Sequence, residues 1–204
     1  PLTRDEIVDR FIAVDDYRFD PGAAREFFEA RCLDRGCGVD DIRVVSHESL
    51  SGNLHSGGHG SREILTRLVA TFPEAVFVTF VREQASLSCS AYKQFVRDGG
   101  CASPKGYFSV PEAWSNQVPR FRFEHLEFDR IVDWLFDAVG RERTVVLPYE
   151  WFRRDPGRIE SALSEACGRE IPMEEALRRR IRESHPIMFS LSLIHISEPT
   201  RHHV

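Results

Sequence analysis

The stretch FPEAVFVTFVREQASLSCSAYKQFVRDGG, residues 72–100, contains an apolar run that stops abruptly at a charged residue. The run VFVTFV, residues 76–81, has the near-continuous apolar character of a strand that is covered on both faces of a parallel sheet. Arg82 ends this strand, and the residues that follow, 83–100, predict a helix. A buried strand that leads directly into a helix is the unit from which α/β sheets are built.

The rest of the chain repeats this alternation of strands and helices. Two further short strands are predicted, IRVVS at residues 42–46 and TVVLP at residues 144–148. Helical periodicity predicts the remaining elements at residues 3–14, 20–36, 61–72, 127–140, 149–168 and 173–184. Residues 101–126 have mixed character and form an excursion that we expect to lie over a site. The pattern predicts a single α/β domain, a parallel sheet with helices on both faces.

Composition limits the classes of function. The chain has 204 residues and a formal net charge of −5, which argues against a general nucleic-acid-binding protein. Its five cysteines have neither zinc-site nor redox-motif spacing, so we expect a reducing, cytoplasmic location. We find no apolar run long enough to span a membrane.

Arg82 and Ser90 are the first candidate binding residues. Arg82 stands at the carboxyl end of the predicted strand, where open parallel sheets bind their ligands. Ser90 lies about two helical turns into the following helix, within reach of a long guanidinium group. Arginine can give two parallel hydrogen bonds to a phosphate, and a serine hydroxyl can add a neutral one. The spacing predicts a phosphate-binding pair, although an arginine and a serine also occur this far apart by chance.

Two histidines, His55 and His59, are four residues apart in LHSGGHG, residues 54–60. Such spacing places two metal ligands on one face of a helix, but the paired glycines disfavour a helix here. We therefore predict no metal site.

Other polar and aromatic residues admit two interpretations. Tyr149 and Glu150 follow the strand at residues 144–148, and we expect them to order the loop rather than to perform chemistry. Tyr107, Phe108 and Trp114 could line an acceptor pocket, or could simply pack against the core.

The stretch around Arg82 resembles a nucleotide-binding motif of the sulfotransferase family, which uses 3′-phosphoadenosine 5′-phosphosulfate. The bacterial branch of that family shows R-x-Q after a buried strand, then S-x-Y-x-Q in the helix and a pair of glycines. The corresponding residues here are 82–84, 90–94, and Gly99 with Gly100. Residues 121–156 also resemble the family's later helix, strand and Y-E before a D-P turn. The resemblance covers roughly residues 42–168 and implies a P-loop-like core.

The resemblance also implies the roles of the candidate residues. Arg82 and Ser90 would hold the 3′-phosphate of 3′-phosphoadenosine 5′-phosphosulfate, and no metal would be required. The S-x-E pattern of Ser46 and Glu48, in VVSHESLSG at residues 44–52, would supply Glu48 as the base that takes the acceptor's proton. His47 is the alternative base, because imidazole titrates near neutrality. The acceptor would be a hydroxyl or an amine, on a small molecule or a glycan.

The chain departs from the family at its beginning and at its end. We find no loop with a lysine and Gly-Ser-Thr residues to cradle the phosphosulfate, since no lysine precedes Lys93. We interpret residues 1–190 as a partial sulfotransferase domain, and we expect the chain as written to be inactive. Residues 191–204 resemble the translation of a sequencing adapter, so we exclude His195, His202 and His203 from any metal site. Two alternatives remain, a P-loop nucleotide kinase and a non-catalytic α/β interaction domain.

Overall fold

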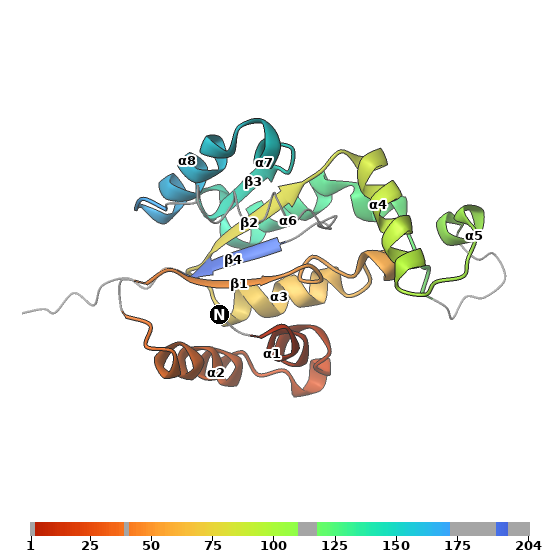
Figure 1. Ribbon diagram of the computed structural model, residues 1–204. Helices are drawn as coiled ribbons and strands as arrows, with labels where there is room; N and C mark the ends of the chain where they lie inside the picture. The colour runs from red at the N-terminus through yellow and green to blue at the C-terminus, as the bar shows by residue number, and fades with distance from the viewer. Residues whose placement is uncertain (1–2, 39–40, 110–117, 172–190, 196–204) are drawn as a thin grey trace, which may run out of the picture.

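The structure is a computed structural model that describes residues 3–38, 41–109, 118–171 and 191–195. It is a mixed α/β structure in which a small twisted sheet lies between helices (Figure 1). The strands are β1 (Arg43–His47), β2 (Val76–Val81), β3 (Thr144–Pro148) and β4 (Leu191–His195). The α-helices are α1 (Arg4–Ile7), α2 (Pro21–Asp34), α3 (Ser61–Thr71), α4 (Gln84–Arg97), α5 (Pro104–Phe108), α6 (Phe128–Val139), α7 (Trp151–Arg154) and α8 (Pro156–Cys167). Short helical turns complete the described part, η1 (Val8–Ile12), η2 (Asp16–Arg18), η3 (Leu54–Ser56), η4 (Phe123–Leu126) and η5 (Arg141–Arg143).

The sheet corrects the prediction of an entirely parallel arrangement. The strand order is β1-β4-β2-β3, and the pairing of β2 with β3 is parallel as predicted. β4 pairs antiparallel with both β1 and β2, so these two strands run in the same direction without touching each other. The difference arises from residues 191–195, for which no strand was predicted and which fill the position between β1 and β2.

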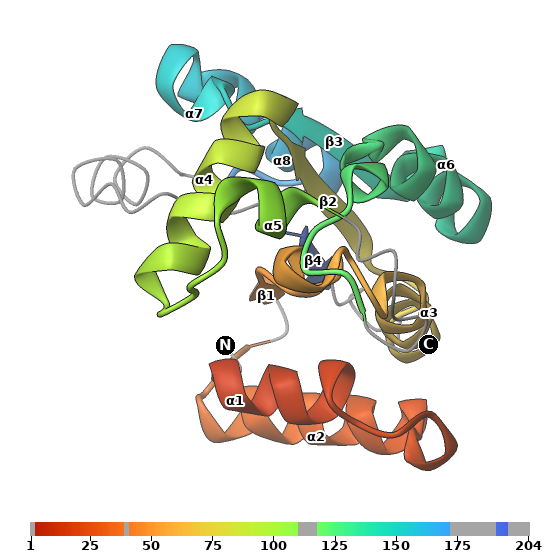
Figure 2. The same ribbon diagram turned by 90° about the vertical axis from the view of Figure 1, so that its right-hand side faces the viewer.

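Helices cover both faces of the sheet, as the apolar strands predict. Val45 of β1 and Phe77 of β2 belong to a core that includes α2, α3 and α6. The neighbouring positions Val44, Val76 and Val78 point to the other face, where they pack with α8. Figure 2 shows α1 and α2 as a separate layer beside α3, at a distance from β3 and α8.

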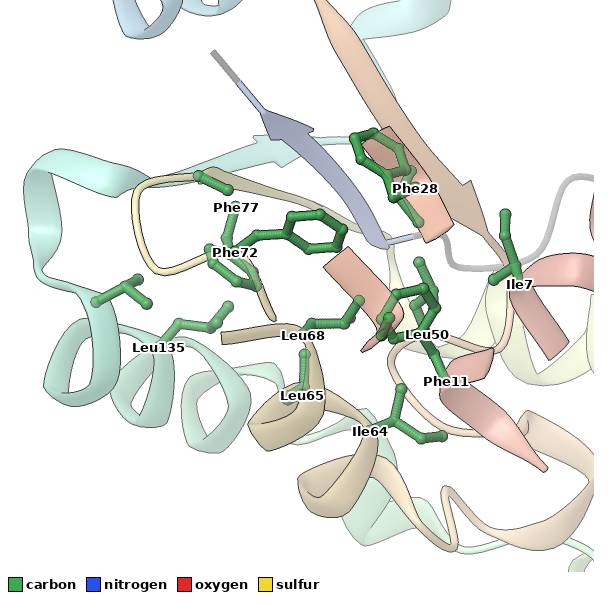
Figure 3. Packing of buried hydrophobic residues seen from close by; sticks show 14 of the residues in the cluster. Ile7, Phe11, Phe28, Leu50, Ile64, Leu65, Leu68, Phe72, Phe77 and Leu135 are labelled. Atoms are coloured by element: carbon green, nitrogen blue, oxygen red, sulfur yellow. The ribbon is translucent and has the colours of Figure 1, made fainter. Parts of the chain in front are cut away.

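The first of these cores is built around aromatic rings. Phe72, at the end of α3, lies edge-on to Phe28 of α2 with ring centroids 5.0 Å apart, and Phe11 lies 6.0 Å away. Figure 3 shows this cluster together with Leu65, Leu68 and other apolar side chains from α3. All three aromatic side chains are buried, so these rings pack α2 and η1 against the end of α3.

Nearby residues cap the ends of several helices. Thr3 and Glu6 make a reciprocal capping box at the start of α1. The side chain of Asp20 accepts hydrogen bonds from two N–H groups at the start of α2, just before Pro21. Gly36 follows α2 with a φ of 71°, a conformation that favours glycine. The helix predicted for residues 173–184 lies outside the described residues.

Arg67 of α3 joins the N-terminal layer to the rest of the fold. Its side chain is buried, and Nη1 donates to the carbonyl oxygen of Phe11 at 2.9 Å. Nη2 forms an ion pair with Asp16, and the guanidinium lies 5.5 Å from the ring centre of Phe19. Phe11 belongs to η1, a π-helical turn, and such turns leave carbonyl groups that need other donors. Arg67 is therefore the donor that satisfies this turn.

We predict that Arg67→Met lowers the free energy of unfolding by about 2–3 kcal/mol, because it leaves a buried carbonyl without its donor and Asp16 without its partner. Methionine keeps much of the apolar part of the arginine side chain, so the loss of stability measures mainly the contribution of the guanidinium group. Urea denaturation measures the change. Arg62→Met on the exposed side of α3 is the control and is expected to change stability by less than about 0.5 kcal/mol. Equal stability of the two variants would contradict this role for Arg67.

Candidate functional site

The carboxyl ends of β1 and β2 lie at the same edge of the sheet (Figure 1), and the candidate residues are at these ends or follow them in the chain. β2 ends at Val81, and α4 begins at Gln84 after a two-residue turn. β1 ends at His47 and leads into the loop that contains η3. This edge is where ligands bind in open α/β sheets.

Arg82 meets two serine hydroxyls of α4. Its Nη2 atom lies 2.9 Å from Oγ of Ser86 and 3.1 Å from Oγ of Ser90. The guanidinium also lies 5.0 Å from the ring centre of Tyr149, a cation–π geometry that fixes its orientation. We call Arg82, Ser86 and Ser90 the Arg82 cluster. The pairing of Arg82 with Ser90 agrees with the spacing argument.

The turn before α4 is tied to the end of β3. The backbone N–H of Tyr149 donates to the carbonyl oxygen of Val81 at 2.7 Å, and the N–H of Glu83 donates to Oε1 of Glu150 at 3.0 Å. The Glu83 carboxylate caps α4 by accepting hydrogen bonds from the N–H groups of Ala85 and Ser86. Tyr149 and Glu150 therefore order this loop.

Glu48 lies in a small charged group at the end of β1. Its Oε1 atom forms an ion pair with Nη2 of Arg4 at 2.8 Å, and its Oε2 atom lies 3.8 Å from Nε2 of His47. The Glu48 side chain is 34% exposed, whereas His47 is buried. The carboxylate is therefore the more accessible of the two candidate bases.

The hydrogen bonds of His47 bear on its ability to act as a base. Its Nδ1 atom accepts a hydrogen bond from the backbone N–H of Ser49 at 3.0 Å. In the neutral ring the proton must then sit on Nε2, which is buried and has no hydrogen-bond partner among the described residues. Burial lowers the pKa of His47, and the nearby Glu48 opposes this shift. Neither ring nitrogen offers a free lone pair to an acceptor hydroxyl.

The two pairs of candidate residues lie apart from each other. Leu191 of β4 is opposite His47 of β1 and also opposite Thr79 of β2. Because strands are spaced by about 4.8 Å, β1 and β2 are about 10 Å apart here. Arg82 lies three residues beyond Thr79, further along the same edge. The structure thus brings together Arg82 with Ser90 and His47 with Glu48, but it does not join the two pairs.

Aromatic side chains form a separate core over this edge. Tyr107 of α5 is fully buried, and its hydroxyl lies 2.8 Å from Nδ1 of His55. Phe108 packs edge-on to Tyr107 at 4.9 Å. Burial raises the pKa of Tyr107, so its phenol stays protonated and can donate to His55. These contacts support the packing interpretation for Tyr107 and Phe108, while Trp114 lies outside the described residues.

The glycine-rich loop places its two histidines differently. His55 belongs to η3, whereas His59 is exposed and forms an isolated β-bridge with Asn53. Within residues 3–38, 41–109, 118–171 and 191–195, no group of three or more His, Cys, Asp or Glu side chains could hold a metal ion. The described helices are all too short or too polar to cross a membrane.

Two contacts of the site were not predicted from the sequence. Ser86 is four residues from both Arg82 and Ser90, so the helical repeat could have placed it on the same face as Ser90. Arg4 offered no such signal, because it is distant in sequence from Glu48. Its contact depends on how α1 packs beside β1.

We predict that the protein loses stability as the pH falls from 7 to 5. Burial lowers the pKa of His47, His55 and His125, so the unfolded chain takes up protons near the ordinary value of 6.5 before the folded chain does. The loss should therefore begin just below pH 6.5. Glu6 contributes in a separate, lower window, since the N–H of Thr3 and the guanidinium of Arg31 lower its pKa to about 2.

Thermal unfolding at a series of pH values measures this dependence. His55→Gln is expected to make it shallower, whereas His59→Gln, at an exposed position in the same loop, is the control and should leave it unchanged. If the midpoint of thermal unfolding of the unsubstituted protein is the same at pH 7 and pH 5, burial of the histidines does not make stability depend on pH.

No protein-family model matches the chain, and neither the curated proteins nor the solved structures include a significant match.

Proposed function

We propose that this chain belongs to a sulfotransferase of P-loop-like fold that uses 3′-phosphoadenosine 5′-phosphosulfate as its sulfuryl donor. In this proposal the reaction moves a sulfuryl group to a hydroxyl or amine, with a carbohydrate as the acceptor. No metal takes part. The five cysteines are free thiols, which supports our placing the enzyme in the cytoplasm.

The observation that carries the proposal is the convergence of Arg82 and Ser90 at the carboxyl end of β2. A guanidinium beside a hydroxyl, 3.1 Å apart, offers the donors that a phosphate group needs. Tyr149 and the cap of α4 hold this arrangement in place before any ligand arrives. Such preorganisation lowers the entropic cost of binding. The residues present thus fit the 3′-phosphate of the donor.

Glu48 is the proposed general base. The acceptor oxygen or nitrogen attacks sulfur as the bond from sulfur to the bridging oxygen breaks, and the acceptor proton passes to the Glu48 carboxylate. The products are the sulfated acceptor and adenosine 3′,5′-bisphosphate. The exposure of Glu48 supports this role, and the hydrogen bond from Ser49 to His47 disfavours the imidazole. Arg4 must move away from Glu48, or share it, when an acceptor binds.

We predict that Arg82→Ala weakens the binding of adenosine 3′,5′-bisphosphate by about 1.5–3 kcal/mol, the contribution of a charged hydrogen bond. Ser90→Ala should cost about 1 kcal/mol. Calorimetric titration measures both. Arg97→Ala, an exposed arginine in the last turn of α4, is the matched control and should change affinity by less than about 0.5 kcal/mol. If Arg82→Ala binds as tightly as the unsubstituted protein, the phosphate assignment fails.

A second prediction concerns Glu48. Glu48→Gln is expected to lower turnover by roughly two to four orders of magnitude and to leave donor affinity nearly unchanged, because the amide cannot accept the proton. The measurement is a sulfation assay in an enzyme that carries the phosphosulfate loop expected from the resemblance. His47→Ala is the comparison. Loss of turnover in His47→Ala but not in Glu48→Gln would make His47 the base.

A further inference from the structure

Two serine hydroxyls share one nitrogen of Arg82. Nη2 lies 2.9 Å from Oγ of Ser86 and 3.1 Å from Oγ of Ser90, and the two serines are one helical turn apart on α4. Of the three residues in the Arg82 cluster, the resemblance gives a role in phosphate binding only to Arg82 and Ser90. The shorter of the two distances belongs to Ser86, the residue without an assignment.

Ser86 and Ser90 differ from their neighbour Ser88 in how their hydroxyl groups form hydrogen bonds. Ser88 donates its hydrogen to the carbonyl oxygen of Gln84 at 2.8 Å, the usual arrangement for a serine inside a helix. Ser86 and Ser90 accept from Arg82, and within the described part of the chain their own hydrogens meet no acceptor. Each hydroxyl can therefore still donate to an incoming oxygen atom.

The backbone donors at the start of α4 are already used. The carboxylate of Glu83 accepts from the N–H groups of Ala85 and Ser86, and the N–H of Glu83 itself donates to Glu150. An anion at this helix start cannot use those groups without displacing a carboxylate. Side chains must supply the donors, and Glu83 adds a negative charge that makes neutral hydroxyl donors more important.

We propose that Ser86 completes a three-donor site, with Arg82 and Ser90, for the 3′-phosphate group of the nucleotide. The inference rests on the proposed function and deepens it, because it names a further residue that selects the donor. A terminal phosphate has three outer oxygens, one for each donor. A phosphate diester has two outer oxygens and a lower negative charge, so a site with three donors selects the monoester.

The test is calorimetric titration of the 204-residue chain with adenosine 3′,5′-bisphosphate, adenosine 5′-monophosphate and inorganic phosphate. The bisphosphate is expected to bind more tightly than the monophosphate. Ser86→Ala should weaken bisphosphate binding about 5-fold, the effect of one neutral hydrogen bond, and should leave monophosphate binding unchanged. Ser86→Thr keeps the hydroxyl and should restore most of the affinity. Ser88→Ala, which loses a hydroxyl that serves the helix itself, is the control and should bind normally.

The outcomes separate the two proposals. If Arg82→Ala and Ser90→Ala weaken binding while Ser86→Ala does not, the role of Ser86 is wrong and the proposed function stands. If the unsubstituted chain does not prefer the bisphosphate, the proposed function fails first. Binding of inorganic phosphate as tight as that of the bisphosphate, with the same loss in Ser86→Ala, would identify a free-phosphate site and overturn the nucleotide assignment.

Discussion

The parallel pairing of β2 with β3 is the constraint on which the candidate site depends. It continues past the last strand residue, where the N–H of Tyr149 donates to the carbonyl of Val81 at 2.7 Å. One residue further, Glu150 accepts from the N–H of Glu83. These two hydrogen bonds set the direction in which the chain enters α4. They also place the Tyr149 ring beside Arg82, so the backbone and the guanidinium are oriented by the same neighbour.

The elements around this pairing were predictable from sequence because their signals are local. The apolar run of β2 is bounded by charged and turn residues, and the same is true of β3. The caps of α1 and α2 depend on residues within three positions of the helix start. Arg82 and Ser90 could be paired for a similar reason, since helix geometry relates them directly.

Non-local contacts limited the rest of the prediction. The place of β4 between β1 and β2 depends on pairing between segments far apart in the chain, and no local pattern encodes that order. The ion pair of Arg4 with Glu48 and the contact of Arg67 with η1 have the same origin. In an extended strand, successive residues such as His47 and Glu48 would point to opposite faces. The chain turns after His47 instead, so the carboxylate comes to lie 3.8 Å from the imidazole.

The separation of the two strand ends sets a requirement on any ligand. A molecule that reaches both Glu48 and the Arg82 cluster must cross the position of β4, a lateral span of about 10 Å. An isolated phosphate or sulfate ion cannot do so, whereas an extended nucleotide with a group at each end can. Under the proposed function, the hydroxyl and guanidinium donors beyond β2 and the carboxylate beyond β1 would form two subsites with different chemistry. In the proposed reaction the sulfur atom under attack would lie near Glu48, at the opposite end of the donor from the 3′-phosphate that Arg82 would hold.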